Sequence, residues 1–163
     1  ASLVGTLSLT TGYFSTALPR ITDPDGLVID GDNRITIQGT QYLLPFRVNT
    51  GAVLTLENLT IRQGDGGIRN DDGTLTLNNS TVSDTTGIGI FNTGALTLND
   101  STVSNNSDSG IYNSGTTTLN HSTLSGNSAR DGGGISNRGA LTLNNSIVRE
   151  NSATGSTASG GGS

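Results

Sequence analysis

A phrase of nine residues recurs five times along the chain, and no other feature restricts the fold as strongly. It combines a Leu-x-Leu or Thr-x-Leu segment with a Thr-Val or similar segment a few residues later. The copies start at Leu54, Leu75, Leu96, Thr117 and Leu141, at intervals of 21, 21, 21 and 24 residues. Self-similarity at such a period is the signature of a solenoid, in which each repeat winds once and stacks on the next.

Alternation of side chains predicts which residues of each repeat face inward, because neighbours along a strand point to opposite faces. Each regular repeat holds three short strand segments, of the types Gly-Ile-x-Asn, Leu-Thr-Leu-Asn and Ser-Thr-Val-Ser. The expected inward ladders are Leu56, Leu77, Leu98, Leu119 and Leu143; Ile61, Val82, Val103, Leu124 and Val148; Ile68, Ile90, Ile111 and Ile135; and a ladder of small residues, Ser80, Ser101, Ser122 and Ser146.

These segments predict an all-β chain, a three-sided parallel β-helix of about six to seven coils with a period near 21 residues and no helices. We expect one domain over residues 1–163, with irregular N-terminal coils at 1–52 and regular repeats at 53–150. Residues 151–163 are expected to start a further coil, because Asn151-Ser152-Ala153 repeats the wording of Asn127-Ser128-Ala129.

An asparagine follows each Leu-Thr-Leu segment at a predicted corner of the coil. These residues are Asn78, Asn99, Asn120 and Asn144. Asparagine tolerates the left-handed conformation that a sharp corner needs, and stacked amides can hydrogen-bond from coil to coil. Glu57 is expected to break this ladder at its upper end. His121, the single histidine, falls among corner residues and is interpreted as structural.

Composition excludes several classes of function. The net charge is −5 and the eight basic residues, all arginines, are scattered, so no basic patch for nucleic acid is expected. Without cysteine there is no disulfide framework, and no apolar run approaches the 18 residues of a membrane span. The many Thr, Ser and Asn residues favour an extracellular or cell-surface location.

The phrases at residues 94–107 and 132–148 resemble the repeats of right-handed parallel β-helix proteins of the bacterial surface type. That group includes polymorphic outer-membrane-protein repeats and the pectate-lyase-like superfamily. The resemblance covers roughly residues 27–162 and implies a right-handed coil. It does not imply one activity, since this scaffold carries lyases, hydrolases, adhesins and phage tailspikes.

Catalytic and metal-binding residues are not expected from the pattern of acids, and no cofactor is expected. An enzyme of this fold needs carboxylates gathered on neighbouring coils, but Asp84, Asp108 and Asp131 lie at unequal offsets in a variable corner. Oxygen ligands at the density of the largest acidic group could hold Ca²⁺, but aspartate before glycine is the ordinary turn residue, and we interpret this group as turn residues. These weak calcium candidates are Asp23, Asp25, Asp30 and Asp32.

The leading interpretation is a non-enzymatic structural protein, with head-to-tail self-association or surface glycans as its partners. The chain stops part-way into a coil, which is expected either for a fibre-forming unit or for a piece of a longer array. The alternative is a polysaccharide-active enzyme or a carbohydrate-binding adhesin. A minor alternative is ice binding, suggested by outward columns of threonine at Thr55, Thr76, Thr97, Thr118 and Thr142 and at Thr60, Thr81, Thr102 and Thr123.

Overall fold

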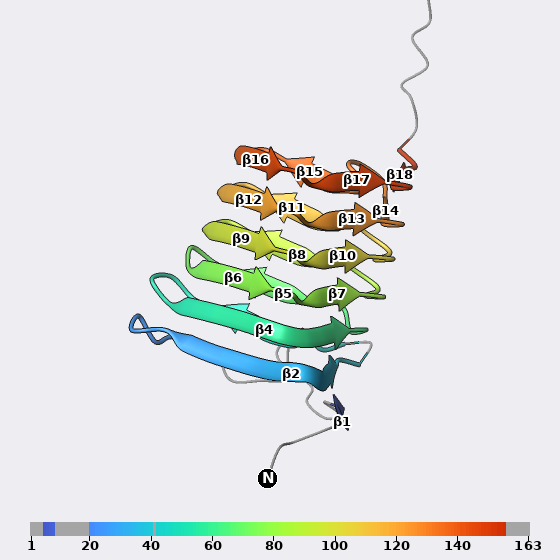
Figure 1. Cartoon of the computed structure of the whole chain (residues 1–163). Helices are drawn as coiled ribbons and strands as arrows, with labels where there is room; N and C mark the ends of the chain where they lie inside the picture. Colours follow the sequence, from blue (N-terminus) through green and yellow to red (C-terminus); the bar gives the residue numbers. More distant parts are fainter. Residues whose placement is uncertain (1–4, 9–19, 41, 156–163) are drawn as a thin grey trace, which may run out of the picture.

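The chain winds as a stack of parallel β-coils in a computed structural model that describes residues 5–8, 20–40 and 42–155 (Figure 1). One sheet of eleven strands forms two of the three faces. Its strands are β1 (Gly5–Ser8), β2 (Leu27–Gln38), β4 (Val53–Arg62), β6 (Thr74–Asn78), β7 (Thr81–Ser83), β9 (Ala95–Asn99), β10 (Thr102–Ser104), β12 (Thr116–Asn120), β13 (Thr123–Ser125), β16 (Ala140–Asn144) and β17 (Ile147–Arg149).

The other strands close the coil. The third face is a five-stranded sheet of β3 (Phe46–Val48), β5 (Ile68–Asn70), β8 (Ile90–Asn92), β11 (Ile111–Asn113) and β15 (Ile135–Asn137). A small pair, β14 (Ser128–Ala129) and β18 (Ser152–Ala153), lies at one corner. Every strand pair is parallel, as winding in one direction requires.

The predicted parallel β-helix is confirmed. Successive coils begin at β2, β4, β6, β9, β12 and β16, so the described residues contain six coil starts, with about five turns from the first to the last. In the N-terminal part, β2 pairs in register with β4 except for one shift between Asp30 and Ile35. At the tail, Ser152 pairs with Ser128; residues 156–163 lie outside the described part, so the further coil expected over residues 151–163 stays a prediction.

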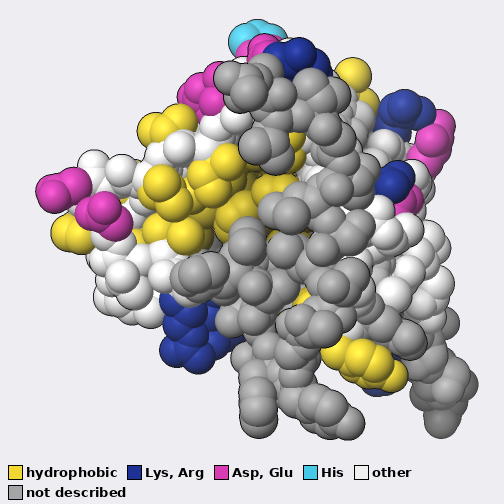
Figure 2. All heavy atoms as spheres, turned by 90° about the horizontal axis from the view of Figure 1, so that it is seen from below, with side chains coloured by type: hydrophobic (Ala, Val, Ile, Leu, Met, Phe, Trp, Pro, Cys, Tyr) yellow, Lys and Arg dark blue, Asp and Glu magenta, His cyan; other side chains and the backbone are white. Residues whose placement is uncertain are grey.

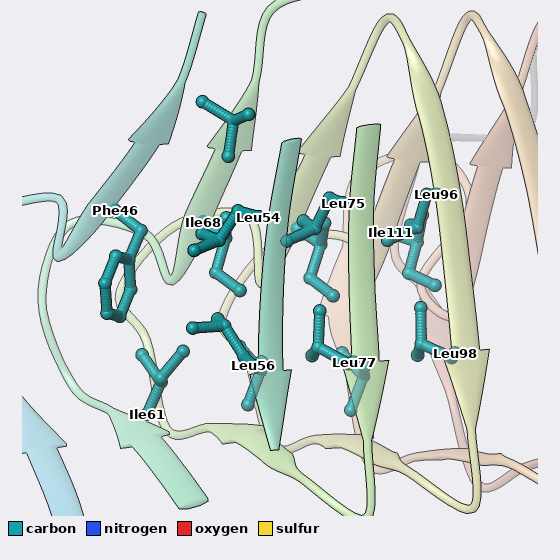
Figure 3. Packing of buried hydrophobic residues seen from close by; sticks show 14 of the residues in the cluster. Phe46, Leu54, Leu56, Ile61, Ile68, Leu75, Leu77, Leu96, Leu98 and Ile111 are labelled. Atoms are coloured by element: carbon teal, nitrogen blue, oxygen red, sulfur yellow. The ribbon is translucent and has the colours of Figure 1, made fainter. Parts of the chain in front are cut away.

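The residues of the expected inward ladders lie in register from coil to coil, and those of the middle coils are buried. Leu56, Leu77, Leu98 and Leu119 follow one another directly across β4, β6, β9 and β12, and all four are fully buried. Figure 3 shows such side chains pointing from successive coils into one continuous core. At the last described coil, Leu143 and Val148 keep the register but are 46% and 47% exposed.

The corner prediction is wrong by one residue. The left-handed conformation falls on the residue after each predicted asparagine, namely on Asn79, Asp100, His121 and Asn145, with φ between 46° and 49°. Asn78, Asn99, Asn120 and Asn144 instead end their strands. Their stacked amides are confirmed: each donates to the side-chain oxygen of the preceding coil at 2.8 Å. Glu57 continues this ladder, because it accepts from Asn78 at 2.8 Å.

The small-residue ladder has a hydrogen-bonding role at the same corner. The hydroxyl oxygen of Ser101 accepts the backbone N–H of Ser80 at 3.1 Å, and the hydroxyl donates to the backbone oxygen of Asn99 at 2.8 Å. Ser80, Ser122 and Ser146 repeat the second contact on their own coils. Serine therefore satisfies backbone groups that the corner would otherwise leave unpaired in the interior.

Two further polar ladders lie in the interior and were not predicted. Asn70, Asn92 and Asn113 are fully buried, and each donates to the asparagine oxygen of the following coil at 2.7 to 2.9 Å. At another corner Asn106 and Asn127 do the same, with Asn151 as the last acceptor. No buried side-chain polar atom of the described residues lacks a partner.

No helix occurs within residues 5–8, 20–40 and 42–155, and hence none there is long and apolar enough to cross a membrane. At the β2 end of the stack, Figure 2 shows hydrophobic side chains in the middle of the end and charged side chains toward its rim. Val28 is 61% exposed, which makes it one of the more exposed apolar residues of the described chain.

Candidate functional site

A groove of about 550 Å³ lies along the β3–β5–β8–β11–β15 face, where the loops before β5, β8 and β11 form its wall. Arginines and an aromatic residue of the strands line it together with two loop aspartates, Asp65 and Asp108. Tyr42 lies at the groove with 77% of its surface exposed, and the half-buried Leu44 and Ile88 add apolar surface. Apolar walls with a few convergent polar groups are typical of ligand sites.

A column of large side chains follows the outward position of these strands. Register places Arg47, Arg69, Phe91 and Tyr112 directly above one another. Phe91 and Tyr112 stack with ring centroids 4.9 Å apart and planes 3° from parallel. The guanidinium of Arg69 lies 4.3 Å from the centre of the Phe91 ring, and that of Arg138 lies 5.7 Å from the centre of the Tyr112 ring.

This stack leaves little aromatic surface for a ligand. One face of the Phe91 ring is covered by Arg69 and the other by Tyr112, whose second face is covered by Arg138. Arg138 also donates to the Tyr112 hydroxyl at 3.2 Å. Such cation–π and ring contacts stabilise the face by roughly 0.5–1 kcal/mol each. Tyr42 is therefore the aromatic residue of the groove that is placed to contact a ligand.

The two groove arginines share one carboxylate. The Nε–H groups of Arg47 and Arg69 donate to the two oxygens of Asp71 at 2.6 and 2.7 Å. Asp71 is only 20% exposed, so the contact is partly shielded from water. Charge-assisted hydrogen bonds of this kind hold the guanidinium planes in fixed orientations.

Asp65 and Asp108 occupy the same place on coils that are two apart, and Gly87 occupies it on the coil between them. Each lies three residues before an isoleucine of the ladder Ile68, Ile90 and Ile111, whose members are paired in register. A Cβ atom on Gly87 would lie 2.1 Å from the backbone oxygen of Asp65, so no side chain fits there. The two aspartates are thus roughly 10 Å apart along the stack, with a gap between them.

The calcium candidates act as turn residues. Asp23 accepts the backbone N–H of Asp25 at 2.9 Å, and Asp30 accepts that of Asp32 at 2.8 Å. Asp32 forms an ion pair with Arg34. Across the described residues, no group of three or more acidic or histidine side chains is arranged to hold a metal ion. The interpretation of Asp23, Asp25, Asp30 and Asp32 as turn residues therefore fits their contacts.

A surface without charge covers much of the other two faces. Outward positions on β6, β7, β9, β10, β12, β13 and β16 hold threonine, serine, alanine or asparagine. The threonine columns predicted from the sequence are in register, as Thr76, Thr97 and Thr118 show on β6, β9 and β12. The large side chains Arg47, Arg69, Phe91 and Tyr112 thus lie on the groove face, apart from these uncharged strands.

Sequence reasoning placed no functional residue in the groove. The signal was present in the Gly-Ile-x-Asn segments, whose third position holds Arg69, Phe91 and Tyr112 at intervals of 22 and 21 residues. Asp108 was considered only as an isolated loop acid, and its match with Asp65 was missed because Gly87 separates the two and because each stands in a loop of different wording.

Comparison with known proteins agrees with this architecture. Neither curated proteins nor solved structures give a match for the chain. A family model described as a right handed beta helix region matches residues 21–163, which agrees with the parallel strands and confirms the resemblance stated from the repeats. Since this match covers most of the sequence, the chain belongs to the right-handed β-helix region family.

Proposed function

We propose that this protein is a non-enzymatic, extracellular or cell-surface β-helix that adheres to glycans through the groove of the β3–β5–β8–β11–β15 face. The observation that carries the proposal is the groove itself, which combines exposed Tyr42 with polar side chains held in fixed positions. A sugar ring offers an apolar face to an aromatic ring and hydroxyl groups to carboxylates. Asp65 and Asp108 supply such acceptors.

The geometry favours binding over hydrolysis. In an acid–base pair acting on a glycosidic bond, one carboxyl group is usually held in an apolar setting that keeps it protonated. Asp65 is exposed, and it lies two coils from Asp108, whose carboxylate accepts the backbone N–H of Ser109 at 2.6 Å. These features support an adhesive role.

The experiment is a glycan array probed with the protein, followed by titration of the strongest ligands. Tyr42→Ala should weaken binding at least about tenfold, or about 1.4 kcal/mol. Thr97→Ala, on the uncharged face, is the matched control and should leave affinity unchanged. No binding to any glycan would contradict the proposal. Release of reducing sugars from a polysaccharide would favour the enzymatic alternative.

Head-to-tail self-association stays a prediction. What supports it is the exposure of Leu143 and Val148, which continue the inward ladders on the last described coil, and of Leu27 on β2. Strand edges with exposed apolar side chains are templates for pairing with another chain. Sedimentation velocity over a wide concentration range tests this, and a monomer at every concentration would contradict it.

Ice binding is a second candidate, favoured by the register of the outward threonines. Thr76, Thr97 and Thr118 repeat at the spacing of parallel strands, about 4.8 Å, on a surface without charge. Ala95 and Ala140 interrupt the neighbouring column, where Thr74 and Thr116 also lie. Thermal hysteresis of the intact protein, compared with Thr97→Glu, tests this role; equal hysteresis in both would contradict it.

A further inference from the structure

We infer that the groove selects neutral or amino sugar units and discriminates against uronate units. This inference rests on the proposed glycan-binding function and specifies its substrate class. It follows from which charged groups of the groove are paired within the protein and which are not.

The positive charges of the groove are committed within the protein. Asp71 accepts from the Nε–H of both Arg47 and Arg69, so neither arginine can offer the paired Nε and Nη edge to a ligand carboxylate. The central carbon of the Arg69 guanidinium lies over the Phe91 ring, 4.3 Å from its centre. What remains of each arginine is its outer Nη groups, which can donate single hydrogen bonds to hydroxyl oxygens.

Two negative charges of the groove, unlike its positive charges, remain available to a ligand. Asp65 and Asp108 line the groove, and among the hydrogen bonds and ion pairs of the described residues neither carboxylate pairs with a cation. With Asp71 included, three carboxylates surround two guanidinium groups, which gives a net charge of −1. A uronate entering the groove would meet Asp65 and Asp108 across the gap at Gly87, and like charges at such distances repel.

Hydroxyl and ammonium groups fit the same acceptors. A carboxylate accepts hydrogen bonds and cannot donate them when ionised, so Asp65 and Asp108 require donors from the ligand. Tyr42 can contact the apolar face of the ring, and Leu44 and Ile88 extend that apolar surface. The preference is therefore for neutral and amino sugars.

The test compares three oligosaccharides of equal length, one of glucosamine, one of glucose and one of galacturonate, by calorimetry at low and physiological salt. We expect the glucosamine oligomer to bind at least tenfold tighter than the galacturonate oligomer, with a difference that shrinks as salt is added. In Asp65→Asn/Asp108→Asn, the affinity for glucosamine should fall about tenfold and that for galacturonate should rise.

Asp84→Asn is the matched control. Asp84 lies in the loop between β7 and β8, at the same corner of the coil as Asp65 and Asp108, but it does not line the groove. It should change none of the three affinities. Tighter binding of galacturonate by the unmodified protein would overturn the inference while leaving glycan binding in place. Failure of all three oligosaccharides and of the glycan array to bind would instead contradict the proposed function, and this inference with it.

Discussion

The side-chain amide of Asn92 donates a hydrogen bond of 2.9 Å to the side-chain oxygen of Asn113 on the next coil, and both side chains are completely buried. The side-chain amide of Asn113 in turn donates to the side-chain oxygen of Asn137 at 2.7 Å and to the backbone oxygen of Ala140 at 2.9 Å. These asparagines therefore satisfy polar atoms of three successive coils inside a largely apolar core.

Asn113→Ala should destabilise the fold strongly. The change removes an acceptor from the buried amide of Asn92 and takes a fully buried, hydrogen-bonded side chain out of the core, which should cost about 1–3 kcal/mol. We expect a loss in this range in urea denaturation. Ser114→Ala, at the exposed neighbouring position, should stay within about 0.5 kcal/mol. Similar losses for both variants would show that the ladder does not stabilise the coil.

The inward ladder can be tested at Val103, which is fully buried between Val82 and Leu124 on adjacent coils. Val103→Asp would place an unpaired carboxylate in the core and should cost several kcal/mol. Thr102→Asp, whose side chain points to the other face, should be nearly silent in the same denaturation experiment. A tolerated Val103→Asp would show that this side chain does not face the interior.

These ladders could be predicted because they depend on two regular quantities, the repeat period and the alternation of side chains along a strand. The position of the left-handed residue could not be fixed in the same way. Asn78 and Asn79 are both asparagines, and the choice between them depends on the strand pairing that keeps Asn78 in β6. The buried role of Asn92 and Asn113 was missed since asparagine in a strand usually indicates a turn or a wet face.

His121 provides a test of the corrected corner. Its φ of 49° lies in the left-handed region, which asparagine adopts easily and β-branched residues do not. His121→Asn should leave stability unchanged or raise it by about 0.5 kcal/mol, while His121→Val should cost about 1–3 kcal/mol. Thermal unfolding of both variants measures this. Equal stability of the two would contradict a left-handed residue at this position.

The groove itself was beyond what the repeat could reveal. Register alone brings Phe91 onto Tyr112, but the sharing of Asp71 by Arg47 and Arg69 depends on how the side chains turn after the strands are formed. Gly87 leaves a gap between Asp65 and Asp108 because it has no side chain. A glycine in a loop does not by itself indicate a ligand site in a sequence. The fold was therefore predictable to a larger extent than the candidate site.

Asp30 should titrate at an unusually low pH. The backbone N–H of Asp32 lowers its pKa from the ordinary value of 3.8, and the amide of Asn58, at 3.0 Å, lowers it further. Since the pKa is lower in the folded protein, this contribution to stability is present above the unfolded pKa and is lost as the pH falls through the folded value. An NMR titration of the Asp30 carboxyl carbon should show a midpoint below 3.8.

The variant Asn58→Gly tests the cause of this shift. It keeps the left-handed backbone but removes one donor to Asp30, so it should move the midpoint of the Asp30 titration upward. Asn105→Gly, a similar change at a distant corner, should leave that midpoint unchanged. An unchanged midpoint in Asn58→Gly would mean that the amide contact does not hold the carboxylate in solution.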